Sequence, residues 1–379
     1  MKTLPVPRVH FYEGGKRCPE DICLPSCLRA VAEFLGDVDF GCKHCLTANP
    51  SCKIFCSYAF LTGVSGAAAF LSWQEGWSGD NPGLVFMARD PYAAERRAFA
   101  ALGYELGILE KENGRDNESL FRQAIVDSLD AGLPVLAYGV IGPPEPCIIT
   151  GYDAQEDVLI GWNFFQSDPM FAAGLTFEPG GEFRKPNWFA DTLHLDLIRA
   201  RRPHPPLKET YRAALDWLLE VGRTPVVWPG PEAPQAFRGR RHGLAAYTAW
   251  AEQLLRGEEI TGGDEQQLRK CFGVHDVQVG TLAEARWYGS QFLIEAANPD
   301  YHPPLSLAED LYHAAAAYAA QHDLMWNLWG LAGGNGNPAG YRLFADPAVR
   351  RKMYAVILAA REKEFEALAY MEKAVQKRH

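Results

Sequence analysis

The stretch GPPEPCIITGYDAQEDVLIGWNFF, residues 142–165, predicts two antiparallel strands joined by a tight turn. The runs CIITGYD and VLIGWNFF are short and rich in β-branched and aromatic residues, a composition typical of strands. The polar residues Ala-Gln-Glu-Asp between them form the expected turn. A further strand, PVLAYGVI over residues 134–141, is expected directly before this hairpin. Together these runs predict a meandering β-sheet in the first half of the chain.

Helical patterns precede the predicted sheet. Apolar residues recur at helical spacing in 23–36, 90–103 and 116–132, and each of these segments ends in or just before a glycine stop. The segment 90–103 also opens with Asp-Pro, as a complete helix often does. Helices followed by a meandering sheet are the layout of an α+β domain.

The second half of the chain is mostly helical in pattern. The expected helices are 207–221, 242–256, 264–272, 280–297, 306–330 and 346–376. The last opens with Asp346 and Pro347, a typical N-cap and first helical residue, and places Met353, Phe365 and Met371 near one apolar stripe. A chain of 379 residues exceeds what one hydrophobic core normally fills. We therefore predict an α+β domain over 1–200 and an all-α domain over 201–379.

Composition and charge exclude several classes of partner. The net charge of −10 argues against nucleic-acid binding, which needs clustered Lys and Arg. No stretch reaches about 18 uninterrupted apolar residues, so no membrane span is expected. The first residues, MKTLPVPRVHFYEGGKRC, lack the apolar core of a secretory signal. We therefore expect a cytoplasmic protein with no membrane partner.

Cys23 is a candidate nucleophile because it opens the predicted helix 23–36. Unpaired backbone N–H groups and the positive end of the helix dipole lower the pKa of a thiol placed there. The alternative is that Cys23 is a small buried residue of the core, as free cysteines often are.

Two segments carry a resemblance to known families. The segment CLPSCLRAVAEFLG (23–36) and the strands over 134–165 resemble, in the same order, the cysteine-bearing helix and the hairpin of bacteriocin-processing cysteine peptidases. They are also similar to the N-terminal domain of the butirosin biosynthesis protein H family. The resemblance covers roughly residues 15–170 and implies a papain-like fold in that part of the chain. It implies thiol-dependent acyl transfer, or amide or thioester hydrolysis, on a small-molecule or acyl-carrier-type substrate.

The resemblance also implies roles for individual residues. Cys23 takes the position of the nucleophile, and Asn163, at the end of the second strand, takes that of the orienting residue. Glu145 stands where the family has its catalytic histidine. An oxyanion-hole side chain is expected a few residues before the nucleophile, where Arg17 and Lys16 are the candidates.

Glu145 in place of histidine leaves two functions open. A carboxylate can accept a thiol proton, so Cys23 and Glu145 could form a thiol enzyme with an unusual base. A carboxylate also repels a thiolate, whereas a histidinium stabilises it. That repulsion favours a non-catalytic metal- or ligand-binding protein that keeps the cysteine-peptidase fold.

Residue spacing predicts the neighbours of Glu145. Side chains two apart on a strand share a face, so Cys147 is expected beside Glu145, and Cys27 lies one helical turn beyond Cys23. These groups would form a redox pair or a metal site, unless Cys27 and Cys147 simply fill the core. Trp162 is expected near the hairpin, in a pocket or in the core.

The segment CKHCLTANPSCKIFC, residues 42–56, predicts a metal site within the first domain. Its cysteines, Cys42, Cys45, Cys52 and Cys56, have the spacing C-x2-C-x6-C-x3-C. Four thiolates in a short loop suit a closed tetrahedral zinc site of structural type. An iron–sulfur cluster, disulfides and free thiols are the alternatives.

Overall fold

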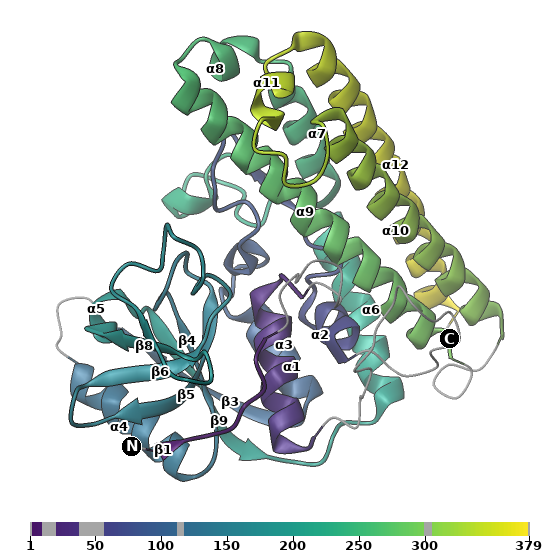
Figure 1. The fold of residues 1–379 in the computed structure, drawn as a ribbon. Helices are drawn as coiled ribbons and strands as arrows, with labels where there is room; N and C mark the ends of the chain where they lie inside the picture. The colour runs from purple at the N-terminus through teal and green to yellow at the C-terminus, as the bar shows by residue number, and fades with distance from the viewer. Residues whose placement is uncertain (1, 10–19, 38–56, 112–116, 299–304, 378–379) are drawn as a thin grey trace. The chain divides into compact units, whose positions relative to one another are not determined.

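The computed structural model describes residues 2–9, 20–37, 57–111, 117–298 and 305–377 (Figure 1). The described chain is a mixture of helices and strands, compatible with an α+β protein, and it is mainly helical after residue 206. It divides into two compact units. We call Met1–Leu61 with Glu95–Pro205 the N-terminal unit, and Thr62–Ala94 with Pro206–His379 the helical unit.

This division differs from the single domain boundary predicted at residue 200, because residues 62–94 group with the C-terminal helices. Long-range hydrogen bonds explain this grouping. The indole N–H of Trp217 donates to the carbonyl of Ser65 (3.0 Å), and the guanidinium of Arg286 donates to the carbonyl of Ala68 (2.6 Å). The segment 62–94 is therefore an insertion in the first half of the sequence that completes the second unit.

The N-terminal unit contains a sheet whose strands pair antiparallel in the order β3-β9-β4-β5-β6-β8-β7, with β1 paired to β5 (Figure 1). The strands are β1 (Lys2–Thr3), β3 (Tyr104–Glu110), β4 (Val135–Tyr138), β5 (Pro146–Asp153), β6 (Val158–Trp162), β7 (Thr176–Phe177), β8 (Phe183–Pro186) and β9 (His194–Arg201). The predicted hairpin is confirmed as β5 and β6, and the strand expected before it is confirmed as β4.

The register of that hairpin depends on Gly161. The pairing of β5 with β6 shifts between Ile149 and Gly151, where the ladder is irregular. A Cβ atom at Gly161 would lie 1.9 Å from the carbonyl oxygen of Ile148, so this approach of the two strands excludes any other residue.

The helices of the N-terminal unit are α1 (Cys23–Leu35), α3 (Ala93–Ala101), α4 (Glu118–Asp130) and the short α5 (Trp188–Asp191), and α2 (Ser57–Ser65) spans the first boundary between the units. The helices expected over 23–36, 90–103 and 116–132 are thereby confirmed, with shorter bounds at their ends. Helix α1 ends at Gly36, whose φ of 67° is the left-handed conformation that glycine adopts most readily. It packs against β5, which brings the thiol-bearing helix to the predicted hairpin.

The helical unit contains α6 (Leu207–Arg223), α7 (Gly243–Leu254), α8 (Gly257–Thr261), α9 (Glu265–Ala296), α10 (Leu305–Leu331), α11 (Gly340–Phe344) and α12 (Pro347–Gln376). It also contains an antiparallel strand pair, β2 (Ser72–Gln74) with β10 (Arg240–His242), so the expectation of an all-α domain is wrong in this detail. Two short 3-10 helices, Leu84–Phe86 and Gln235–Phe237, belong to the same unit.

Helix α9 is continuous where the sequence pattern predicted two helices, 264–272 and 280–297. Gly273 and Gly280 interrupt the apolar pattern between them. A glycine inside a helix costs about 1 kcal/mol relative to alanine. Burial of flanking residues such as His275 and Val279 against the neighbouring helices outweighs that cost.

Helix α12 begins as predicted and packs with one deviation. The carboxylate of Asp346 accepts a hydrogen bond from the N–H of Ala348 (2.7 Å), and Pro347 occupies the first helical position. Met353 and Met371 are buried, but Phe365 is 54% exposed and does not belong to the buried stripe. Helix α10 packs against both α9 and α12 (Figure 1).

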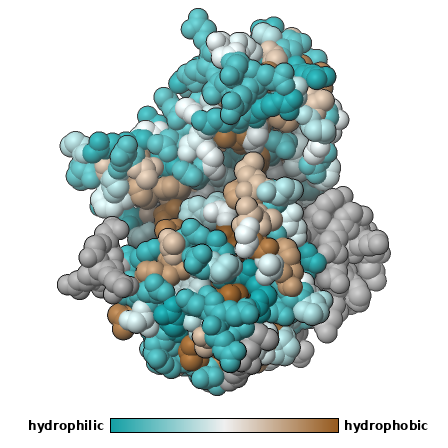
Figure 2. Space-filling model, turned by 60° about the vertical axis from the view of Figure 1, so that its left-hand side comes forward, coloured by the Kyte–Doolittle hydropathy of each residue, from teal (hydrophilic) through white to brown (hydrophobic). Residues whose placement is uncertain are grey.

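Hydrophobic residues are also found on the surface, in small patches among hydrophilic ones on the face drawn in Figure 2. Such scattered apolar atoms are normal for a folded protein. Among the described residues, no helix is both long enough and apolar enough to span a membrane.

Candidate metal centre

Three side chains of metal-ligating type meet inside the N-terminal unit. Glu95 lies in the first turn of α3, and His194 and Asp196 lie on β9. His194 and Asp196 are two residues apart on one strand, so their side chains share a face. One ligand atom from each of the three lies within 4.8 Å of the other two. These three residues could therefore hold a metal ion, and we call them the Glu-His-Asp group.

Asp196 is the member of this group whose environment points most directly to a ligand. It is 1% exposed, and its hydrogen-bonding neighbour is the hydroxyl of Tyr138, which lowers the pKa of the carboxyl group. Nε2 of His194 lies 3.9 Å from Oδ1 of Asp196, and the positive charge of Arg96 also lowers the pKa of this carboxyl group. Burying an ionised carboxylate is costly, and coordination of a cation is one way to offset that cost.

The imidazole of His194 is held by an aromatic neighbour. The ring of Tyr138, at the end of β4, stacks on it with ring centroids 4.0 Å apart and an interplanar angle of 20°. Burial lowers the pKa of His194 to about 4, so the imidazole is neutral at neutral pH. A neutral imidazole has a free electron pair and is the form that binds metals.

The hydroxyl of Tyr138 lies among acidic groups. It is buried, and it lies close enough to the Asp196 carboxylate to lower the pKa of that group as a hydrogen-bond donor. Burial raises the pKa of this phenol well above its ordinary value, and the nearby carboxylates of Glu95, Asp196 and Glu145 add to the effect. The Tyr138 ring therefore contacts the imidazole while its hydroxyl is placed close to the carboxylates.

The carboxyl groups of this cluster disfavour each other's charge. Burial, followed by the charge of Glu95, raises the pKa of Asp196 well above its ordinary value. The same two causes raise the pKa of Glu145 to about 8. Glu145 is a half-buried residue whose carboxyl group is enclosed. Without a bound cation, this region therefore keeps protons on its carboxyl groups near neutral pH.

Cys27 carries a thiol close to Glu145. The Cys27 thiol donates a hydrogen bond to the carbonyl of Pro146 (Sγ···O 3.6 Å). Its pKa is raised well above the ordinary value by burial first, and then by Cys147 and Glu145. The structure thus brings Cys27, Cys147 and Glu145 into one neighbourhood, as the residue spacing suggested.

Cys147 and Cys23 have other contacts. The thiol of Cys147 donates to the carbonyl of Ala137 (3.2 Å), and burial raises its pKa to about 12. Cys23 is the first residue of α1 and is buried, with Sγ 3.9 Å from the carbonyl oxygen of Asp21. Protonated, buried thiols such as those of Cys27 and Cys147 are poor nucleophiles and poor metal ligands.

Asn163 and Trp162 make contacts that fix the chain. The Asn163 side-chain oxygen accepts a hydrogen bond from the N–H of Phe165 (2.6 Å), which closes the turn after β6. Its side-chain nitrogen is buried and has no partner among the described residues. The indole N–H of Trp162 donates to the carbonyl of Val6 (3.1 Å), so Trp162 anchors the N-terminal segment to the sheet.

Six residues predicted from the sequence lie outside the described part of the chain, among them the oxyanion-hole candidate Lys16. The others are the second oxyanion-hole candidate Arg17 and the four predicted zinc ligands Cys42, Cys45, Cys52 and Cys56.

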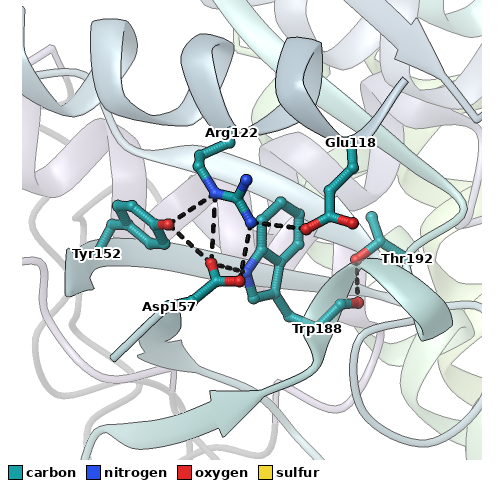
Figure 3. A network of polar contacts seen from close by, with 6 residues as sticks. All are labelled: Glu118, Arg122, Tyr152, Asp157, Trp188 and Thr192. Atoms are coloured by element: carbon teal, nitrogen blue, oxygen red, sulfur yellow. Dashed lines mark hydrogen bonds and ion pairs between the residues drawn. The ribbon is translucent and has the colours of Figure 1, made fainter. Parts of the chain in front are cut away.

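A second polar cluster in this unit has a structural role (Figure 3). Arg122 of α4 donates to Asp157 (2.8 Å), Tyr152 (2.8 Å) and Glu118 (2.6 Å), and the indole N–H of Trp188 also donates to Asp157 (3.2 Å). These bonds tie α4 and α5 to the turn between β5 and β6. The groups satisfy one another, and the ion pairs of Arg122 are partly exposed to solvent, so they contribute little to stability.

Sequence reasoning missed Glu95, His194 and Asp196. Glu95 lies in a helix of ordinary composition, and His194 and Asp196 alternate with leucines in HLDL, a pattern that fits any strand. The only usable signal was that HLDL puts a histidine and an aspartate on one face of a strand. The pairing of β9 between β3 and β4 makes that face part of the core.

Comparison with known proteins gave no relative from which a function could be inferred. No model of a protein family matches the sequence, and a search of curated protein sequences found no significant match.

Proposed function

We propose that the N-terminal unit binds one divalent metal ion through Glu95, His194 and Asp196. The observation that carries this proposal is the meeting of three ligating atoms within 4.8 Å of one another, one of them from the buried carboxylate of Asp196. Such a carboxylate is costly in an apolar interior unless a cation compensates it. The stacked, neutral imidazole supplies a nitrogen ligand in a defined orientation.

The donor set indicates the kind of ion. Two carboxylates and one imidazole suit zinc, manganese or iron(II), and zinc sites of this size use three protein ligands. This site is separate from the four-cysteine zinc site proposed for residues 42–56. Its ligands would be oxygen and nitrogen atoms, whereas the four cysteines would offer sulfur.

Manganese is the best probe because oxygen ligands suit Mn²⁺ and thiolates prefer softer ions. We expect chelator-treated protein to bind about one Mn²⁺ per chain, measured as the loss of the free Mn²⁺ signal in electron paramagnetic resonance. Asp196→Asn should abolish this binding. Asp191→Asn is the matched control, because Asp191 lies close in sequence but pairs with Lys185 at the surface (2.7 Å).

Folding of the variant is checked separately. Without metal, Asp196→Asn should be at least as stable as the unmodified protein, because it removes a buried carboxylate that neighbouring Glu95 disfavours. Equal Mn²⁺ binding by Asp196→Asn and Asp191→Asn, or no binding by the unmodified protein, would refute the proposed site.

A second candidate function is thiol chemistry on a papain-like fold with Cys23 as nucleophile. The observation in its favour is that Cys23 is the first residue of α1, whose first turn contains no acidic residue. The backbone N–H groups of that turn favour a thiolate. The substrate class remains the one that the resemblance implies, a small molecule or an acyl group on a carrier, with Glu145 and Asn163 as supporting residues.

Alkylation rates test this second candidate. If Cys23 is a reactive thiolate, iodoacetamide should modify it at neutral pH faster than Cys271, a buried thiol of α9 whose pKa burial raises. Modification is located by mass spectrometry of peptides. A Cys23 that reacts no faster than Cys271 is a core residue, and the metal-binding function then stands alone.

A further inference from the structure

The helical unit has a row of aromatic rings on α9 and α10 that runs from the core to the surface. It consists of Trp287 on α9 and His322, Trp326 and Trp329 on α10, and we call it the aromatic surface. Successive ring centroids lie 5.0 Å (Trp287–His322), 6.1 Å (His322–Trp326) and 4.9 Å (Trp326–Trp329) apart. Trp329 is buried beneath the row, whereas Trp326 is 49% exposed.

Hydrogen bonds hold the polar edges of these rings. The indole N–H of Trp326 donates to Nε2 of His322 (2.8 Å), and Nδ1 of His322 lies 3.1 Å from the carboxylate of Asp323. Because Nε2 accepts, Nδ1 carries the proton and donates to Asp323. The indole N–H of Trp329 donates to Asp276 (2.9 Å). The ring orientations are therefore fixed, and what Trp326 presents to a partner is an apolar ring face.

The charge beside these rings is negative. The Asp323 side chain is 80% exposed, next to the indole that it helps to orient. Helix α10 contains neither lysine nor arginine. Between residues 271 and 296, α9 contains one basic residue, Arg286, and its guanidinium is buried in an ion pair with Glu364 (2.7 Å). An exposed indole face beside exposed carboxylate is the arrangement that attracts cations.

We propose that the aromatic surface is a docking site for a basic peptide segment of a partner protein. A lysine or arginine side chain of that segment lies on the exposed face of Trp326, and its charged end pairs with Asp323. The cation–π interaction is strongest with tryptophan, and the fixed indole loses little conformational entropy on binding. This inference concerns the helical unit and is independent of the metal centre.

The size of the surface favours a peptide over a small free amine. The rings with exposed surface are those of Trp287, His322 and Trp326, and they cross from one helix to the next, so they offer contacts to more than one side chain. A small amine would use only Trp326 and Asp323. The acidic character of the surface argues against nucleic acid, whose phosphates need basic partners.

The full-length chain can be tested with labelled synthetic peptides. The probes are a glycine-alanine peptide that carries three lysines and the same peptide with three glutamates, with binding followed by fluorescence anisotropy. We expect the lysine peptide to bind and the glutamate peptide not to bind. Trp326→Leu and Asp323→Asn should each weaken binding of the lysine peptide, about tenfold for the loss of the indole.

Phe365→Leu is the matched control, because Phe365 is an equally exposed aromatic residue on a different helix, α12. It should bind the lysine peptide as the unmodified protein does. If Trp326→Leu binds the lysine peptide as well as Phe365→Leu does, the binding reflects overall acidity and the proposal is wrong. Spermine that competes as well as unlabelled lysine peptide would also overturn it, because a free amine would then be the ligand.

Discussion

At the scale of single residues, the hairpin β5–β6 depends on one glycine, which has no side chain. Gly161 allows the backbone of β6 to approach the carbonyl of Ile148, where a Cβ atom would lie 1.9 Å away. This contact is with backbone, which cannot rotate aside as a side chain can. The contact lies beside the irregular step in the register of the hairpin, between Ile149 and Gly151.

We therefore expect Gly161→Ala to reduce the free energy of unfolding by about 2 kcal/mol or more. Gly107→Ala is the matched control on strand β3, because a Cβ there meets the side chain of Arg199, which is exposed and can move. Urea unfolding of the two variants gives the comparison. A similar midpoint for both would mean that β6 can shift away from Ile148 at little cost.

The acidic cluster shows why single positions could not be assigned from sequence. Glu145 was singled out because it stands where the resemblance expects a histidine, and the structure places its carboxyl group near Glu95 and Cys27. The thiol of Cys23, its expected partner, is instead 3.9 Å from the carbonyl of Asp21. One helical turn separates Cys23 from Cys27, and the orientation of α1 on the sheet brings Cys27 close to Glu145.

At the scale of elements, helix α9 combines an unusual length with polar residues in its buried face. His275 is 2% exposed, and its Nδ1 accepts a hydrogen bond from the indole N–H of Trp250 (3.2 Å). Burial lowers the pKa of His275 to about 3. The folded helical unit therefore keeps this imidazole neutral under conditions in which an unfolded chain would protonate it.

This difference predicts a dependence of stability on pH. Below pH of about 6.5 the unfolded state binds a proton at His275 that the folded state does not, so the free energy of unfolding falls as the pH decreases. The slope from this one group is about 1.4 kcal/mol per pH unit, and it continues toward the folded pKa of about 3. His242, whose pKa burial lowers to about 4, acts in the same direction.

His275→Asn isolates this contribution, because asparagine retains an acceptor near the position of Nδ1 and does not titrate. Between pH 6 and 4, the loss of stability of this variant should be smaller by about 1.4 kcal/mol per pH unit. His313→Asn, at a half-exposed position of α10, serves as the control. If both variants lose stability as steeply as the unmodified protein, His275 takes up a proton in the folded state.

At the scale of the whole molecule, the two units have different sources of stability. The helical unit has a large apolar core that includes Trp73, Trp250 and Met353, with the buried pair Arg286–Glu364 beside it. The N-terminal unit instead contains the carboxyl groups of Glu95, Glu145 and Asp196, which disfavour each other's charge. A cation bound to these carboxyl groups would offset their mutual repulsion, and it would stabilise the N-terminal unit only.

Bound metal should therefore stabilise the N-terminal unit selectively. At a free Mn²⁺ concentration of about 100 times the dissociation constant, the gain in its free energy of unfolding is about 2.7 kcal/mol. Hydrogen exchange measured by mass spectrometry should show slower exchange in α3 and β9 and unchanged exchange in α9. Slowing of equal size in both units, or none in β9, would contradict binding at the Glu-His-Asp group.

The sequence by itself determined the elements whose signals are local. The hairpin over 142–165, the helix that begins at Cys23 and the capped start of α12 depend on residues close together in the chain, so composition, periodicity and capping residues were sufficient. Only the tertiary structure decided the placement of residues 62–94, the continuity of α9 through two glycines and the meeting of Glu95 with His194 and Asp196. These features depend on contacts between residues far apart in the sequence. Packing of that kind outweighs local preference, and no local pattern records it.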